Sequence, residues 1–340
     1  MRHNLLDLRY KLLIGMLLVV DLFLRKEPEV FAGIDIGNRS IYGLSLRKLS
    51  PGFRVDSFDI QLLPEQAVQN NEIKNHDAVS ASLKKMLQTI NVTDAVIAMP
   101  GSSVILKTIQ LDKDLSDRVM EEQVWLEAGN IFSQKIEDMV FDFYKLGQSD
   151  IKSDKVDVML VATRTENVNS RCSILTEAGF KVKIVDVNYF ALANACSEVS
   201  SGLAVAIFNI NFPVLSLIVL HDGAIIYTRE DMITNTETAS SIPLIEKIVA
   251  QMQHNMQFFY SAAKTCNIDK IIITGDIMDI SDNDLIAKIK ETMSLDASLA
   301  DPFKNITSAA QVDQESLHKN AAAMTTSFGL ALRGFCDDMY

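Results

Sequence analysis

Apolar residues near the start of the chain fall in short runs separated by polar turns. Residues 30–36, 41–48 and 53–61 are three such runs, and the second alternates between apolar and small or polar positions, as a strand with one buried face does. Residues 76–90 then carry apolar side chains at helical spacing, and residues 95–99 form a short apolar run. The pattern predicts three strands, a helix and a fourth strand, in this order.

The same order of elements recurs in the second half of the chain. We expect turns at residues 209–211 and at residues 222–223. The recurring elements are strands at 203–210, 214–221, 224–229 and 270–274 and a long helix at 240–265. The repetition predicts an internal duplication of two α/β lobes. Two such lobes face each other across a cleft at the ends of their strands, where open α/β sheets bind ligands.

A β-rich insert interrupts the first lobe. The remaining predicted elements, in the insert, in the rest of the first lobe and near residue 330, are strands at 104–110, 139–145, 156–163 and 183–187 and helices at 116–130, 165–178, 189–197 and 320–334. Gly179 ends the helix at 165–178, because glycine readily adopts the left-handed conformation of a C-cap. The expected division is a lead-in at 1–29, a first lobe at 30–199 with the insert at about 101–164, and a second lobe at 200–340.

Composition narrows the class of protein. The chain has 340 residues and a formal net charge of −12, which argues against general nucleic-acid binding because phosphates would be repelled. Its four cysteines and five histidines are scattered, without the spacing of a zinc site or of a Cys–His nucleophile. Widely separated cysteines are typical of thiols in a reducing compartment.

The lead-in allows three interpretations. Residues 12–24 are mostly apolar but shorter than the stretch of about 20 residues that spans a membrane. The three interpretations are a helix on a membrane surface, a helix that binds a partner protein, and a segment that precedes the true start of translation. Met16 is the alternative start for the third. We favour the third.

The turn after the first strand carries the candidate chemistry. Gly37 allows the backbone to approach a phosphate closely, and Asn38 and Ser40 offer hydrogen-bond donors there. Asp35, at the end of a buried strand, can hold Mg²⁺ through water. An ordinary β-hairpin with a polar turn explains the same residues equally well.

Segments along the chain resemble the PilM family, the actin-like proteins of type IV pilus assembly within the actin-like ATPase superfamily. The segments are residues 33–37, 98–105, 125–128, 141–143, 158–164, 178–180, 185–187 and 328–334. Each match is modest, but their order is specific. The resemblance implies two actin-like, ribonuclease H-like lobes around a central cleft, with an FtsA-type 1C subdomain inserted in the first lobe.

The resemblance also implies a function. It indicates a cytoplasmic scaffold, peripheral to the inner membrane, that binds the short cytoplasmic N-terminal tail of PilN and joins the pilus alignment subcomplex. ATP and Mg²⁺ would bind between the lobes. Self-association is left open. The alternatives are an active actin-like ATPase or sugar-kinase-like enzyme, and an FtsA-like membrane-associated filament protein.

The chain departs from the family pattern at the nucleotide contacts. Tyr42 stands where the family has a lysine, and the second phosphate turn reads Asn209-Ile210-Asn211 instead of Asp-Ile-Gly. Tyrosine supplies no positive charge, and an amide is a poorer Mg²⁺ partner than a carboxylate. We therefore expect weak or degenerate ATP binding and no efficient ATPase. The expected nucleotide-binding residues are Asp35, Gly37, Asn38, Ser40, Asn209, Asn211 and Gly275, with Asp35 as the metal ligand.

Overall fold

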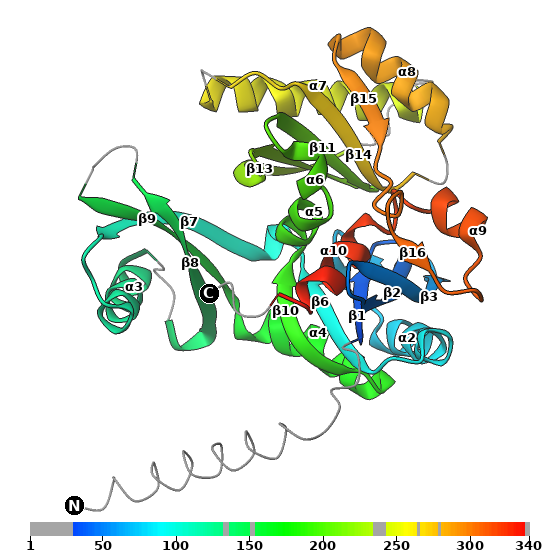
Figure 1. The fold of residues 1–340 in the computed structure, drawn as a ribbon, viewed down its shortest axis with the longest axis horizontal. Coiled ribbons are helices and arrows are strands. Elements are labelled where there is room, and N and C mark those ends of the chain that lie inside the picture. The colour runs from blue at the N-terminus through cyan, green and yellow to red at the C-terminus, as the bar shows by residue number, and fades with distance from the viewer. Residues whose placement is uncertain are drawn as a thin grey trace, which may run out of the picture.

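Two α/β lobes lie one above the other, and a small subdomain projects sideways from the first (Figure 1). The computed structural model describes residues 30–131, 136–149, 154–233, 243–263, 266–277 and 280–336. The lead-in at 1–29, with its three interpretations, lies outside the described residues.

The first lobe is built on a mixed sheet in which β1 is central. The strands are β1 (Val30–Ile36), β2 (Ser40–Lys48), β3 (Phe53–Leu62), β6 (Asp94–Met99), β10 (Lys181–Val187) and β16 (Thr307–Ser308). Their order is β10-β6-β1-β2-β3-β16. Strands β1, β2 and β3 are antiparallel, whereas β6 and β10 run parallel to β1.

The second lobe repeats this sheet. Its strands are β11 (Ala204–Asn211), β12 (Val214–His221), β13 (Ala224–Met232), β14 (Lys270–Asp276) and β15 (Asp296–Leu299). Their order is β13-β12-β11-β14-β15, again with an antiparallel meander followed by two parallel strands. The expected duplication of two α/β lobes is therefore confirmed in strand order and in direction.

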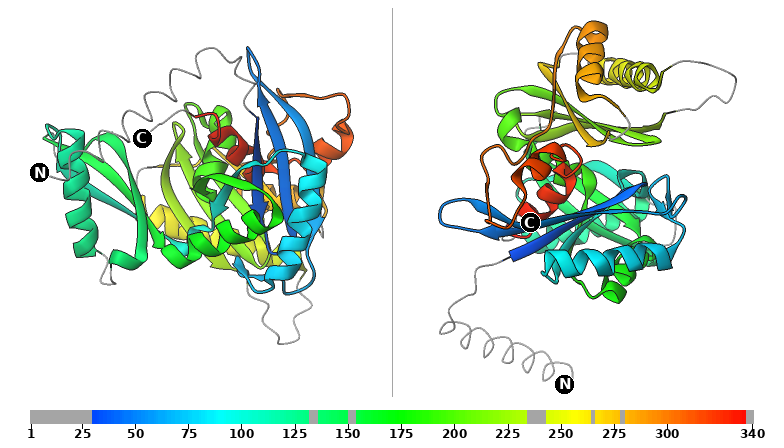
Figure 2. Two further views of the ribbon diagram at one scale, coloured as in Figure 1. Left: turned by 90° about the horizontal axis from the view of Figure 1, so that it is seen from below. Right: turned by 90° about the vertical axis from the view of Figure 1, so that its right-hand side faces the viewer.

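Helices cover both faces of each sheet. They are α2 (His76–Ile90), α4 (Thr165–Ala178), α5 (Asn188–Ala195), α6 (Ser197–Ser200), α7 (Leu244–Ala262), α8 (Asp282–Met293), α9 (Gln314–Lys319) and α10 (Thr325–Arg333). One core joins α2 and α4 to the outer face of the first sheet, and another joins α7 and α8 to the outer face of the second. Helices α5 and α10 lie between the two sheets (Figure 2).

The insert forms a subdomain with its own core. Strands β7 (Val104–Asp112), β8 (Met139–Gln148) and β9 (Lys155–Arg164) pair in the order β7-β9-β8. Helix α3 (Asp117–Ile131) packs on one face of this sheet through Met120, Val124 and Ala128. Two single-turn 3₁₀ helices, η1 (Gly101–Ser103) and η2 (Ile136–Asp138), flank β7 and β8.

The chain after residue 300 returns to the first sheet. Strand β16 pairs with β3, and a core formed by β2, β3 and residues 303–335 buries Leu44, Leu46, Phe303 and Phe328. Helix α10 approaches β1 very closely: a Cβ added to Gly33 would lie 1.9 Å from the backbone oxygen of Ser327. Residues 303–335 thus pack on the first sheet, with α10 at the junction of the lobes.

Most predicted elements are present within about two residues, and a few differ. The turn expected at residues 209–211 is wrong, because these residues end strand β11 and the chain turns at 212–213. The final helix, expected at 320–334, begins only at Thr325. The α-helices and strands not predicted from the sequence are α6, α8, α9, β15, β16 and the short hairpin of β4 (Val68–Gln69) and β5 (Glu72–Ile73).

Candidate functional site

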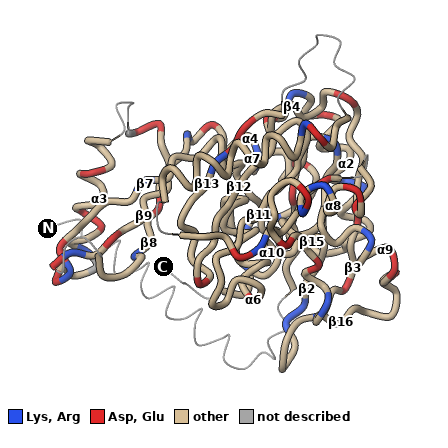
Figure 3. Tube along the Cα trace, turned by 90° about the horizontal axis from the view of Figure 1, so that it is seen from above, with Lys and Arg blue, Asp and Glu red and all other residues tan. Residues whose placement is uncertain are grey.

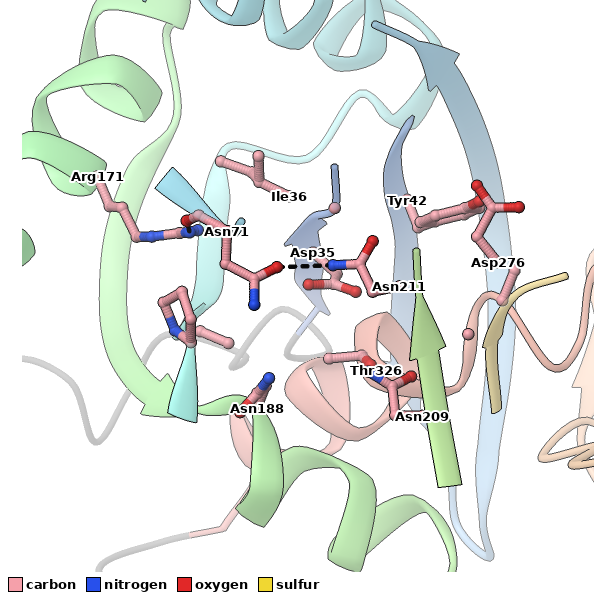
Figure 4. A pocket seen from close by; sticks show the side chains of 15 residues that line it. Asp35, Ile36, Tyr42, Asn71, Arg171, Asn188, Asn209, Asn211, Asp276 and Thr326 are labelled. Carbon is pink, nitrogen blue, oxygen red and sulfur yellow. Dashed lines mark hydrogen bonds between the residues drawn. The ribbon is translucent and has the colours of Figure 1, made fainter. Parts of the chain in front are cut away.

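A cavity lies between the lobes, where β1 and β11 end. It is lined by Asp35, Ile36, Gly37, Tyr42, Asn71, Ala98, Pro100, Arg171, Asn188, Asn209, Asn211, Gly275, Asp276, Ala323 and Thr326 (Figure 4). Parallel strands from both sheets direct their carboxyl ends to this point, which explains why polar residues from distant parts of the chain meet here. The cavity volume is about 30 Å³, enough for about two water molecules.

Asp35 and a buried arginine, Arg171, line the same cavity and interact through their charges. Burial raises the pKa of the Asp35 carboxyl to about 6, while the charge of Arg171 and a hydrogen bond from Thr326 act in the opposite direction. Arg171 comes from α4 and is only 7% exposed, and burial lowers the pKa of its guanidinium to about 10. Arg171 therefore stays protonated at neutral pH and supplies positive charge to the cavity that Asp35 lines.

Three asparagines close the cleft with hydrogen bonds between the lobes; we call Asn38, Asn71 and Asn211 the asparagine clamp. The backbone N–H of Asn38 donates to Oδ1 of Asn211 (3.0 Å), and Nδ2 of Asn38 donates to the backbone oxygen of Asn211 (2.8 Å). Nδ2 of Asn211 in turn donates to Oδ1 of Asn71 (2.8 Å; Figure 4). Because buried amides are costly unless paired, these contacts favour the closed arrangement.

Asn71 reaches the cleft from the tight turn between β4 and β5. Asn70 and Asn71 have φ angles of 51° and 65°, as a two-residue type I′ hairpin requires. Asparagine tolerates this left-handed backbone better than most residues. The Asn-Asn pair itself is the sequence signal for this turn.

The far side of the cavity is filled by Tyr42 and Asp276 (Figure 4). Burial, and then the neighbouring Asp276 carboxylate, raises the pKa of the Tyr42 phenol. Asn209 accepts a hydrogen bond from Oγ1 of Thr274 (3.0 Å), and a Cβ added to Gly275 would lie 2.8 Å from Oδ1 of Asn209. Gly275 has a φ of 96°, so glycine is needed there for conformation as well as for space.

The model of the family described as type IV pilus assembly protein PilM matches residues 33–242 and 234–335. This chain belongs to the PilM family. A solved structure described as the PilM-PilN type IV pilus biogenesis complex is 18% identical, with a TM-score of 0.73, and the match covers 89% of this chain and 98% of that chain. The ethanolamine utilization protein EutJ from Carboxydothermus hydrogenoformans is 10% identical, with a TM-score of 0.50 and coverage of 93% and 96%.

The structure brings together most of the nucleotide contacts expected for a PilM-family chain. Five of the expected residues line the cavity: Asp35, Gly37, Asn209, Asn211 and Gly275. Asn38 does not line the cavity but is hydrogen-bonded to Asn211, which does. Ser40 is fully buried and does not line the cavity. Asn71 and Arg171, which also line the cavity, were not among the residues expected from the sequence.

The residues present do not fit a magnesium nucleotide in this arrangement. The volume of about 30 Å³ is far below that of a nucleotide. The expected metal ligand Asp35 already interacts with the positive charge of Arg171, and Asn211 and Tyr42 line the same cavity. Within the described part of the chain, no group of three or more His, Cys, Asp or Glu residues is placed to hold a metal ion.

A larger groove adjoins the cleft between the first sheet and the insert. Its volume is about 550 Å³. It is lined by Asn70, Asn71, Glu72, Ile73, Met99, Pro100, Ser102, Ser103, Arg164, Glu166, Asn167, Ser170 and Arg171. These residues come from the β4–β5 turn, from the segment around η1 and from the start of α4. Asn71, Pro100 and Arg171 line both the groove and the cleft.

The surface of this PilM-family chain carries mixed charge. Acidic and basic residues are interspersed over both lobes and the insert (Figure 3). No helix among the described residues has both the length and the hydrophobicity needed to cross a bilayer.

Proposed function

We propose that this chain is a scaffold of the type IV pilus assembly platform, and that its groove holds the cytoplasmic N-terminal tail of a PilN-like membrane protein. The observation that carries the proposal is the groove of about 550 Å³ beside the insert, in a chain of the PilM family. The similar solved structure is described as a PilM-PilN complex. On this proposal the chain is cytoplasmic, lies at the inner membrane through its partner, and belongs to the alignment subcomplex.

The groove suits a short extended peptide. Its volume is within the usual range of ligand sites, and its walls are mainly polar, with Ile73, Met99 and Pro100 as apolar positions. Arg164 and Glu166 form an exposed ion pair on one wall, with a separation of 3.1 Å between Nη1 and Oε1. Polar walls can bind the backbone of an extended peptide, while the apolar positions accept side chains at alternate residues.

We further propose that nucleotide binding is weak or degenerate and that the chain has no efficient ATPase activity. The closed cleft supports this proposal, because the asparagine clamp and Tyr42 occupy the space next to Asp35. Asn209 replaces the second carboxylate with an amide, which binds Mg²⁺ less well. Scaffolding through the groove needs no turnover at this cleft.

Calorimetry with a synthetic peptide of the PilN N-terminal tail tests the scaffold proposal. Ser170 lies on α4 in the groove wall, so Ser170→Trp is expected to weaken binding at least tenfold by filling the groove. Ser173→Trp is the matched control, because Ser173 is exposed on the same helix but is not in the groove lining. Binding should be the same with and without Mg-ATP. Absence of binding to the unmodified protein, or equal loss in both variants, would contradict the proposal.

A further inference from the structure

Asn71 is the point at which the groove and the cleft meet. It lines both cavities, and it is only 7% exposed. Its position is set by the β4–β5 hairpin, whose two strands contain only two residues each. A hairpin this short is not stable by itself, so its conformation depends on the contacts that it makes with the rest of the protein.

The backbone of Asn71 is tied to the first lobe. Its N–H donates to Oδ1 of Asn38 (2.8 Å), and its carbonyl accepts from Nη2 of Arg171 (2.8 Å). Both partners are themselves buried, at 7% exposure each. These bonds hold the turn against the first sheet and α4.

The side chain of Asn71 is tied to the second lobe. Its Oδ1 accepts from Nδ2 of Asn211 (2.8 Å), and its Nδ2 lies 3.5 Å from Oε1 of Glu230 on β13. The other carboxylate oxygen of Glu230 is held by Ser216 (3.2 Å) and Tyr189 (3.4 Å). All four polar groups of Asn71 are therefore used, two for each lobe.

We propose that Asn71 couples the groove to the cleft, so that the asparagine clamp, which links the two lobes, also strengthens peptide binding in the groove. The inference rests on the proposed function of the groove. The clamp orders the β4–β5 turn in the peptide-free protein. The ordered turn then forms one wall of the groove that binds the peptide. The clamp contacts and the bound peptide both require an ordered turn, and the conformational entropy of ordering it is lost only once. The clamp therefore strengthens peptide binding, and the bound peptide strengthens the clamp.

The decisive variants change Asn211, which belongs to the clamp but is absent from the groove lining. Asn211→Gly removes both side-chain links of this residue. Asn211→Asp keeps an acceptor for the Asn38 N–H but removes the donor to Asn71. We expect each variant to bind the tail peptide about 5- to 10-fold more weakly, a usual size for coupling between sites. Asn267→Gly, at an exposed position of the second lobe before β14, is the matched control and should bind like the unmodified protein.

A second measurement needs no peptide. Hydrogen exchange of the Asn38 amide reports the clamp directly, because that N–H donates to Asn211. Asn71→Gly keeps the left-handed turn and should speed exchange at Asn38, whereas Asn70→Gly, at the neighbouring exposed turn residue, should not. Thermal unfolding of every variant verifies that the fold is kept.

The outcomes separate the two proposals. If the unmodified protein does not bind the peptide, the proposed function of the groove fails, and the coupling fails with it. If it binds but both Asn211 variants bind equally well, only the coupling is overturned. If the Asn38 amide exchanged at the same rate in Asn71→Gly as in the unmodified protein, the hydrogen bonds of Asn71 would not support the Asn38–Asn211 contact. That result would overturn the asparagine clamp as a unit.

Discussion

Replacing Asp35 by asparagine is expected to make the protein more stable at neutral pH, although Asp35 lies at the centre of the cleft. Burial raises the pKa of this carboxyl from 3.8 to about 6, and the opposing attraction of Arg171 is already contained in that value. A tenfold change in ionisation corresponds to about 1.4 kcal/mol. The ionised carboxylate therefore lowers the free energy of unfolding by about 3 kcal/mol near pH 7. Asparagine has the same size and carries no charge, so Asp35→Asn removes this penalty.

The sign of the pH dependence follows from the raised pKa of Asp35. Between about pH 4 and pH 6 the folded protein binds more protons at this group than the unfolded chain does, so stability falls as pH rises through this window. The penalty is nearly absent below about pH 4 and nearly complete above about pH 7. The advantage of Asp35→Asn should accordingly shrink from about 3 kcal/mol at pH 7 to about 1.5 kcal/mol at pH 5.

Urea denaturation at pH 5, 6, 7 and 8 measures this advantage as the difference between variant and unmodified protein. Asp222→Asn is the control for the loss of one negative charge, because Asp222 is exposed in the turn between β12 and β13. A variant that is no more stable at pH 7, or a gain that does not change with pH, would refute the reasoning. The first result would mean that the attraction between the Asp35 carboxylate and Arg171 stabilises the folded protein by more than the burial of the carboxylate destabilises it.

Three further predictions concern the packing of α10 on β1, the affinity of the cleft for Mg-ATP, and the buried charge of Asp186. Gly33→Ala should destabilise the protein by about 3 kcal/mol or more, seen in the melting temperature, because its Cβ would lie 1.9 Å from the Ser327 carbonyl oxygen; an unchanged melting temperature would contradict this packing. The double change of Asn209→Asp and Asn211→Gly should raise Mg-ATP affinity at least tenfold in calorimetry, since it adds a carboxylate and removes a clamp side chain; no gain would count against the role given to these residues. Asp186→Asn should stabilise the protein at pH 7 by up to about 3 kcal/mol and much less near pH 4, because burial raises the pKa of Asp186 to about 6; a pH-independent effect in urea denaturation would exclude that cause.

The sequence predicted the elements whose pattern is local. The helix at 76–90 was predicted with its exact bounds, and Gly179 ends α4 in the left-handed conformation, with a φ of 104°. Strand β16 was not predictable, because its two residues are fixed by pairing with Arg54 and Val55, some 250 positions away. Helix α8 did carry a readable signal in its N-cap Ser281, which accepts a hydrogen bond from the Asp284 N–H.

The candidate site was predictable to the extent that it lies at strand ends. Asp35, Asn209 and Gly275 could be placed together, because the two lobes repeat one topology and their central strands end at the same cleft. Asn71 and Arg171 could not, because one comes from a two-residue turn and the other from a helix outside the sheet. Asn71 and Arg171 come together only because α4 packs against the first lobe. The local pattern of apolar and polar residues does not predict that packing.

The return of the C-terminal segment to the first sheet has a consequence for how the protein is made. One face of β2 and β3 is covered by residues 303–335, which a ribosome adds about 240 residues after it completes β3. At about 5 to 20 residues per second, that apolar face waits for tens of seconds before its cover is synthesised. The nascent chain therefore exposes the apolar face of an incomplete first lobe throughout that interval. A chain that stops before residue 303 never covers that face and becomes a substrate for chaperones and proteases.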